Sequence, residues 1–245
     1  ALLQRSQGSD PKRDFGRMKW TYLLINVLTL AGPMARSFEP RIAYWRKWKA
    51  LLPAIGLTLA FFVIWDSTFT AMGVWGFTPS YLLGVDLLNL PIEEWLFFIT
   101  IPYACVFIYE VLNHFMLRDW LGGSAAAIAI GGMVLGIVMV ILFWGRLYTV
   151  TSFGLMVVLL GLHVFVFKSA WLGRFFIAFL VSLVPFVIVN GVLTGAVTDA
   201  PVVWYNDAEN LGVRLVTIPL DDIVYGLDLM LMNVSLFEWF KWKLR

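Results

Sequence analysis

The sequence predicts an all-α integral membrane protein with about seven transmembrane helices, arranged as two three-helix repeats plus one linking helix. Hydrophobic residues make up 60% of the chain and charged residues only 14%, whereas a soluble domain carries about 25% charged residues. Several apolar runs reach the roughly 17–25 residues that span a bilayer. A short acidic phrase also occurs twice, each time just before an apolar run. Together these features place most of the chain in lipid.

Seven apolar runs are long enough to be considered as spans. We expect helices over residues 20–35, 51–70, 92–112, 124–143, 150–167, 175–194 and 220–237. The first run is short and is interrupted by Gly32 and Pro33. Basic residues before it and small residues after it also resemble a signal peptide, but no clean cleavage site follows, so we expect a retained helix. Because Met18 looks like a native start, we expect residues 1–17 to be an N-terminal extension or tag.

The distribution of positive charge predicts the topology. The net charge of +2 is too small to indicate a nucleic-acid partner. Lys and Arg gather in the connections after the first, third and fifth runs and at the C-terminus, while the connection over residues 71–91 has neither. By the positive-inside rule the basic connections should be cytoplasmic. We therefore expect a multi-pass protein of a bacterial cytoplasmic (inner) membrane.

The repeated phrase defines the expected domains. Asn89-Leu90-Pro91-Ile92-Glu93-Glu94 matches Thr217-Ile218-Pro219-Leu220-Asp221-Asp222, and Phe62-Val63-Ile64-Trp65-Asp66 matches Phe186-Val187-Ile188-Val189-Asn190. These matches predict a first repeat over residues 18–117, a linking transmembrane helix over 118–148 and a second repeat over 149–245. With one helix between them, both repeats enter the membrane in the same sense. The two acidic pairs should then lie at one depth and face a shared cleft.

The paired acids predict a working site. One acid in the first turn, after a proline, is explained by the positive end of the helix dipole. A second acid is not, because neighbouring residues point about 100° apart and ionisable groups are costly in lipid. The candidate acids and bases are Glu93, Glu94, Asp221 and Asp222, with Asp66 as a reserve acid or an orienting group.

The environment of these acids predicts their chemistry. A carboxyl group removed from water favours its neutral form and can donate a proton, whereas a hydrogen-bonded one stays ionised and can accept one. Aromatic rings can shelter a cation, although Trp75, Phe77 and Tyr81 could equally form an interfacial aromatic belt. The expected substrate contacts are Trp65, Trp95, Phe98, Asn190, Trp204 and Tyr225. Acid, base and aromatic lining together indicate proton-initiated chemistry on an alkene.

Other chemistries have weaker support. Cys105 is the only cysteine, so an internal disulfide and a cysteine metal cage are excluded. The two histidines, His114 and His163, lack the spacing of a metal site, and no glycine-rich dinucleotide motif is present. We therefore expect neither a metal nor another cofactor.

Several motifs resemble one known family. They are Ser37-Phe38-Glu39 with a basic run, Trp65-Asp66, Gly73-Val74-Trp75-Gly76-Phe77, the phrase from Asn89 to Phe98, and Ile101-Pro102-Tyr103. Together they resemble the membrane-embedded lycopene β-cyclases of the heterodimeric type, here in a fused form with both cyclase domains on one chain. The resemblance runs from Met18 to the C-terminus and is stronger in the first half.

The resemblance implies a flavin-independent isomerase that closes β-ionone rings at the ends of lycopene, forming γ-carotene and β-carotene without a redox cofactor. The implied partners are lycopene and membrane lipid, with no nucleic acid, and the oligomeric state is not predicted. By motif, Glu93 and Glu94 match the first acidic pair and Asp221 and Asp222 the second, although a glutamate would be expected in place of Asp221. We expect Glu94 or Glu93 to be the acid and Asp221 or Asp222 to be the base. Asn190, in place of an acid, suggests that the first half carries more of the chemistry.

Two other functional classes fit the same pattern. The protein could be another intramembrane isoprenoid cyclase or a prenyltransferase, in which carboxylates hold magnesium diphosphate. It could also be a small proton-coupled transporter, in which intramembrane acids relay protons. Activity that survives chelation would disfavour the prenyltransferase, and chemical change of the substrate would disfavour the transporter.

Overall fold

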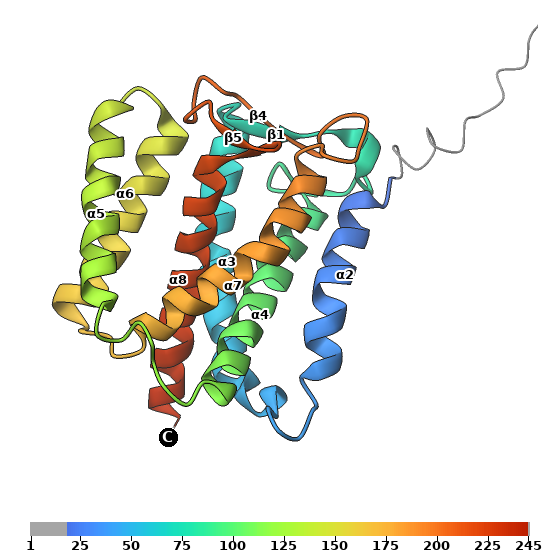
Figure 1. Cartoon of the computed structure of the whole chain (residues 1–245). Helices are drawn as coiled ribbons and strands as arrows, with labels where there is room; N and C mark the ends of the chain where they lie inside the picture. The colour runs from blue at the N-terminus through green and yellow to red at the C-terminus, as the bar shows by residue number, and fades with distance from the viewer. Residues whose placement is uncertain (1–18, 245) are drawn as a thin grey trace, which may run out of the picture.

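The protein is a bundle of seven long helices with small β-ribbons at one end (Figure 1). The computed structural model describes residues 19–244, so the expected extension over residues 1–17 lies outside the described residues. The helices are α2 (Thr21–Arg36), α3 (Trp48–Ala71), α4 (Ile92–Phe115), α5 (Ala125–Leu142), α6 (Leu147–Gly161), α7 (Leu172–Leu193) and α8 (Leu220–Lys243). Short helical turns precede α3 (Tyr44–Lys47), follow β1 (Pro79–Tyr81) and extend α6 (Leu162–Val166).

All seven expected helices are present, which confirms the all-α membrane fold. Six of them, counted within the described residues, are long and apolar enough to cross a membrane. The seventh, α2, has only 16 residues. The helix ends extend beyond several predicted limits, since α3 begins at Trp48 and α8 continues to Lys243. The predictions followed the apolar run, whereas backbone hydrogen bonding continues through polar residues at the membrane interface.

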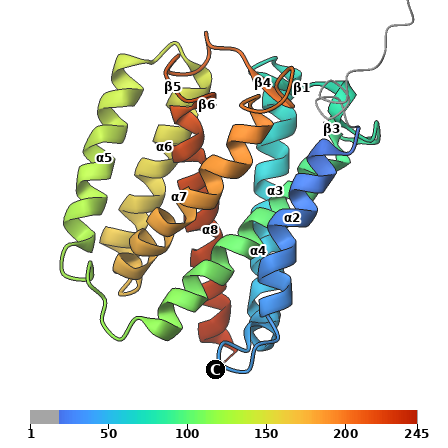
Figure 2. The same ribbon diagram turned by 45° about the vertical axis from the view of Figure 1, so that its right-hand side comes forward.

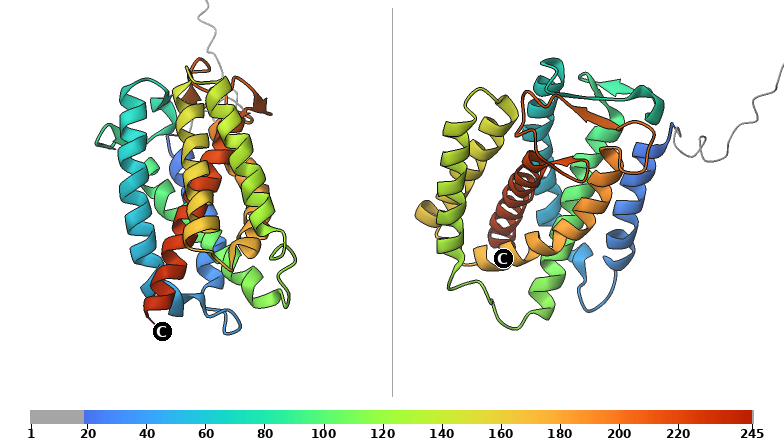
Figure 3. Two further views of the ribbon diagram at one scale, coloured as in Figure 1. Left: turned by 90° about the vertical axis from the view of Figure 1, so that its left-hand side faces the viewer. Right: turned by 45° about the horizontal axis from the view of Figure 1, so that its top comes forward.

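The helices of the two halves begin at equivalent residues, and each half packs a helix against the other half. The middle helix of each half, α3 or α7, packs against the last helix of the other half, α8 or α4. Within each half, α2 packs on α4 and α6 packs on α8. The linking helix α5 lies at the edge of the bundle, mainly against α6 (Figures 2 and 3). This arrangement is what a parallel repeat requires, although the division into domains stays a prediction.

Three two-stranded ribbons, not expected from the sequence, cover one end of the bundle. Strand β1 (Trp75–Phe77) pairs with β4 (Val203–Tyr205) and so joins the two halves. The hairpin of β2 (Asp86–Leu87) and β3 (Leu90–Pro91) leads into α4, and that of β5 (Arg214–Leu215) and β6 (Ile218–Pro219) leads into α8. Each hairpin ends in a proline that lies two positions before the first residue of the acidic pair. The ribbons therefore set where both pairs enter the bundle.

The other end of the bundle is held by buried charge. Glu110, only 2% exposed, accepts hydrogen bonds from Lys47 and from Lys241, the latter at 2.9 Å. Lys241 also pairs with Glu238 at 2.8 Å. These contacts tie α3, α4 and α8 together at the end where the C-terminus lies (Figure 1). The charge pattern predicts that this end is cytoplasmic, and that sidedness stays a prediction.

Candidate active site

A cavity lies beneath the ribbons, between α4, α7 and α8, and its wall is mostly apolar. Three carboxyl groups line it: Asp66 from α3, Glu94 from α4 and Asp222 from α8. All three are nearly inaccessible, with exposed fractions of 3%, 7% and 4%. Acids from both halves of the chain therefore meet in one cavity, as the repeat predicted.

The first acid of each pair does not line this cavity. Glu93 accepts a hydrogen bond from the backbone N–H of Leu83 at 2.7 Å. Asp221 accepts one from the backbone N–H of Leu211 at 3.0 Å and one from the hydroxyl of Thr149 at 2.6 Å. In both halves the N–H belongs to the residue ten positions before the acid. Glu93 and Asp221 thus hold the loop that covers the site.

The second acid of each pair accepts a hydrogen bond from a tyrosine hydroxyl. Tyr22 donates to Glu94 and Tyr148 donates to Asp222, the latter at 2.7 Å. Each tyrosine is the second residue of its helix, α2 or α6, so the two contacts are equivalent. Asp222 accepts a further hydrogen bond from the Tyr205 hydroxyl at 3.0 Å. The sequence analysis missed Tyr22 and Tyr148, which aligning the starts of the two helices would have paired.

Asp66 differs from the other two carboxyl groups in its surroundings. Its Oδ2 atom is buried and accepts no hydrogen bond from any residue in 19–244. It lies within electrostatic range of Glu94. Its counterpart Asn190 also lines the cavity and donates to the carbonyl of Phe186 at 3.2 Å. The repeat therefore contributes one polar side chain from each middle helix.

Aromatic rings form the cavity wall next to the carboxyl groups. Tyr225, one of the expected contacts, lines the cavity together with Trp75, Tyr148 and Tyr205. The ring centres of Trp75 and Tyr148 are 4.9 Å apart, and those of Trp75 and Tyr225 are 6.3 Å apart. The acids are therefore enclosed by ring faces and edges.

Four of the expected substrate contacts lie outside the cavity wall. Trp65 packs behind Tyr225, with ring centres 5.6 Å apart, and Phe98 is fully buried against Phe62. Trp95 donates its indole N–H to the carbonyl of Leu87 at 3.0 Å, and Trp204 covers Gly76, where a Cβ atom would meet its ring. Adjacency in the sequence did not predict these directions, because neighbours on a helix face different sides.

The alternative of an interfacial aromatic belt is wrong for two of the three residues considered. Trp75 and Tyr81 are only 3% and 1% exposed, because the ribbons fold these residues inward. Phe77 is half-buried and lines the cavity. Trp75 and Phe77 of this connection thus form part of the cavity wall.

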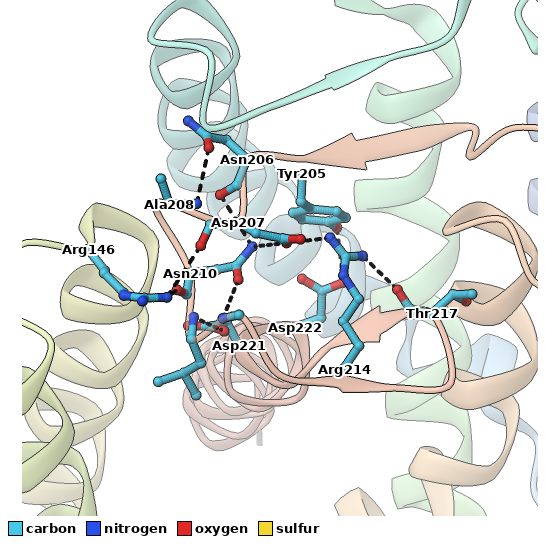
Figure 4. Close-up of polar contacts among 12 residues, drawn as sticks. Arg146, Tyr205, Asn206, Asp207, Ala208, Asn210, Arg214, Thr217, Asp221 and Asp222 are labelled. Atoms are coloured by element: carbon cyan, nitrogen blue, oxygen red, sulfur yellow. Dashed lines mark hydrogen bonds and ion pairs between the residues drawn. The ribbon is translucent and has the colours of Figure 1, made fainter.

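The loop between α7 and α8, residues 194–219, covers the site and is held by a network of hydrogen bonds and an ion pair (Figure 4). Arg214 donates to Asp207 at 2.5 Å and to the carbonyl of Thr217 at 2.7 Å. Burial alone would raise the pKa of Asp207, but hydrogen bonds from Asn210 and Arg214 outweigh it and lower that pKa. Burial, reinforced by the charge of Asp222, raises the pKa of Tyr205 well above its usual value, so its hydroxyl remains a donor.

Comparison with known proteins assigns the family. The model of the family described as "Lycopene cyclase" matches residues 19–112 and 145–240, which is more than half of the chain. The chain belongs to the lycopene cyclase family. The matched segments contain α2 to α4 and α6 to α8, with both acidic pairs, and leave out α5.

A curated relative is consistent with this membership. The "Bifunctional lycopene cyclase/phytoene synthase" of Aspergillus oryzae is 25% identical to the chain over 108 residues, which are 43% of this chain and 18% of the relative. The matched part of this chain therefore covers less than a fifth of that relative's length. No solved structure matches the chain.

Proposed function

We propose that the protein is a lycopene β-cyclase, which closes the linear ends of lycopene into β-ionone rings by acid and base chemistry without net oxidation. The products are γ-carotene after one closure and β-carotene after two. The observation that carries the proposal is the apolar cavity in which Asp66, Glu94 and Asp222 meet among aromatic rings. Membership of the lycopene cyclase family supports the choice of substrate.

The proton comes from the pair of Asp66 and Glu94. Two carboxyl groups close together in a site removed from water do not both ionise, so one retains its proton. Asp66 is the better holder of that proton, because Glu94 accepts a hydrogen bond from Tyr22 that favours the ionised form of Glu94. Its transfer to the terminal double bond leaves a tertiary carbocation, which an internal double bond attacks to close the ring. The faces of Trp75 and Tyr225 stabilise the positive charge.

Asp222 takes the proton that the closed ring must lose. Hydrogen bonds donated to a carboxylate favour its ionised form, and Asp222 accepts two, from Tyr148 and Tyr205. Removal of a ring proton by Asp222 leaves the ring double bond of the product. One proton is added and one is removed, so the reaction is an isomerisation and needs no redox partner.

Glu93 and Asp221, the other two acids of the repeated pairs, have a structural role. Glu93 and Asp221 fasten the two covering loops, each from the first helical turn of its repeat. In this proposal the chain is a duplicated unit, residues 18–117 and 149–245, in which each copy supplies one loop-holding acid and one cavity acid. The lipid-soluble substrate reaches the site from the bilayer, for which we propose a bacterial cytoplasmic membrane.

Expression in cells that accumulate lycopene, together with conversion of added unlabelled lycopene by the purified protein in heavy water, tests the proposal. Chromatography should show cyclic carotenoids, and each new ring should carry one deuterium from solvent. Glu94→Gln and Asp222→Asn, made at matched expression, should accumulate unchanged lycopene. Full ring closure in both variants would contradict the assignment.

The same experiment separates the other functional classes. A transporter would leave lycopene unchanged in cells that express the wild-type chain. A magnesium-dependent prenyltransferase would lose its activity on chelation, whereas the cyclase should retain it.

A further inference from the structure

The duplicated architecture creates two equivalent spaces between helices. One lies between α2, α4 and α7 with α8 beside it, and the other lies between α6, α8 and α3 with α4 beside it. The alignment of the halves pairs Phe62 with Phe186 and, through the acidic phrase, Phe98 with Gly226. The two spaces can therefore be compared residue by residue.

The space in the α3, α6 and α8 part of the bundle is filled. Phe98 and Phe62 are both fully buried, and their ring centres are 6.0 Å apart. Leu229 of α8 is buried in the same cluster, and Leu155 and Met232 pack against it. Large side chains thus occupy this half of the pseudo-symmetric pair.

The equivalent space in the α2, α4 and α7 part is open and belongs to the cavity. Gly226 lies where Phe98 lies in the other half, and both Gly226 and Phe186 line the cavity. A Cβ atom at Gly226 would lie 3.3 Å from the ring of Phe186, which is a tight contact. Ala104 of α4 likewise stands where α8 has Met232. Small side chains therefore leave empty the volume that large ones fill in the other half.

The open space extends far from the carboxyl groups. Its lining along α4 runs from Glu94 to Ile108, about 21 Å at 1.5 Å per residue. Thr29 of α2 and Pro185 of α7 also line it, and Pro185 is exposed on the bilayer-facing part of α7. The shape is that of a groove with its acids at one end and a side opening towards lipid between α2 and α7.

We propose that this groove takes one end of the linear polyene lengthwise, and that Gly226 is the specificity-determining residue that keeps it open. The inference rests on the proposed function and deepens it. Because only one of the two equivalent spaces is open and all three acids line the cavity to which it belongs, a chain closes one end of its substrate at a time. The half-cyclised molecule must leave and return with its other end before the second ring forms.

Substitution of Gly226 tests the groove. Gly226→Leu should reduce ring closure at least tenfold, because its side chain would fill the part of the groove beside Phe186 that Gly226 leaves open. Shortening the opposing ring in the double variant Gly226→Leu with Phe186→Ala should restore most of the activity, measured as turnover per folded molecule so that recovery of folding is not counted as recovery of the groove. Gly56→Leu is the matched control, because Gly56 is exposed on α3 with open space around its Cβ position, and it should behave as wild type.

The outcomes separate the groove from the proposed function. If the wild-type chain closes no ring in lycopene, the proposed function fails. If it does and folded Gly226→Leu is equally active, the groove assignment fails while the function stands. Should Gly226→Leu not fold, Gly226→Ala takes its place: it should be slower than wild type, and undiminished activity would overturn the assignment.

A product time course tests the one-end-at-a-time consequence in the wild-type protein. With lycopene in large excess over enzyme, free monocyclic product should appear first and dicyclic product only after a lag. Dicyclic product formed from the first turnovers, with no free monocyclic product, would overturn this part of the inference.

Discussion

Asp221 and Asp222 are adjacent, but the structure predicts opposite consequences for their substitution. Asp222→Asn removes the carboxylate that faces the cavity and accepts from Tyr148 and Tyr205. Asp221→Asn alters a carboxylate that faces away and holds Thr149 and Leu211. The first change should abolish chemistry, whereas the second should lower stability and leave the turnover of each folded molecule nearly unchanged.

The magnitudes follow from the contacts. Loss of a positioned general base costs about 100- to 10,000-fold in rate, which is the decrease expected for Asp222→Asn. An asparagine at position 221 offers one acceptor oxygen where the aspartate oxygens accept from two donors. One hydrogen bond to a charged group is therefore lost, worth about 1.5–3 kcal/mol of the free energy of unfolding. Turnover per folded Asp221→Asn molecule should remain close to that of wild type.

The assay compares both variants as purified protein in detergent with added lycopene. Turnover is divided by the amount of folded protein from size-exclusion chromatography, and thermal unfolding reports stability. Glu93→Gln and Glu94→Gln, the equivalent pair in the first repeat, should divide in the same way. If Asp221→Asn and Asp222→Asn lost the same turnover per folded molecule, the assignment of one holding acid and one cavity acid would be refuted.

Three further predictions concern neighbouring groups. Tyr148→Phe removes one hydrogen-bond donor to Asp222. Turnover should fall about 10- to 100-fold, which corresponds to the loss of one hydrogen bond to a charged group. An unchanged rate would contradict the role of Asp222 as base. Glu110→Gln leaves Lys47 and Lys241 without their buried partner and should destabilise the fold by about 3–5 kcal/mol in thermal unfolding, whereas exposed Glu39→Gln should change little. Burial would raise the pKa of Asp207, but its hydrogen bonds outweigh burial and lower that pKa. The ionised Asp207 therefore contributes fully to the stability of the loop before α8 above about pH 3.9, the usual pKa of an aspartate. That contribution is lost as the pH falls through the lowered pKa. Amide protection over residues 203–216 should be constant from pH 8 to about pH 5 and fall only in more acid solution; loss already near neutral pH would contradict this.

Much of the fold follows from local features of the sequence. A helix that crosses lipid must satisfy its backbone internally and present about twenty apolar residues, so each span is recorded in one continuous segment. The ribbons were not predicted, because β1 and β4 are only three residues long and their partners are far apart in the sequence. The pairing of Trp75 with Tyr205 depends on how the halves meet, which no local pattern reports.

The sequence predicted which acidic residues belong to the site, but it predicted only some of the directions in which the side chains point. The sequence pointed to five acids and to a shared cleft, and Asp66, Glu94 and Asp222 do line one cavity. Trp65 and Trp95 were selected because they adjoin acids along the chain, but both lie outside the cavity wall. A rotation of about 100° per residue separates such neighbours, so the direction of a side chain is known only once the helix is packed.

The sequence by itself determined that this is a duplicated helical membrane protein with an acidic pair at the mouth of one helix in each repeat, because length, hydropathy and repetition are properties of continuous segments. The tertiary structure decided which acid of each pair faces the substrate space, that Tyr22 and Tyr148 bind the inner acids, and that Gly226 leaves one of two equivalent spaces open. The two tyrosine contacts join side chains that are more than seventy residues apart in the sequence. Their physical basis is the packing of whole helices, which fixes the direction of each side chain and the volume left between them.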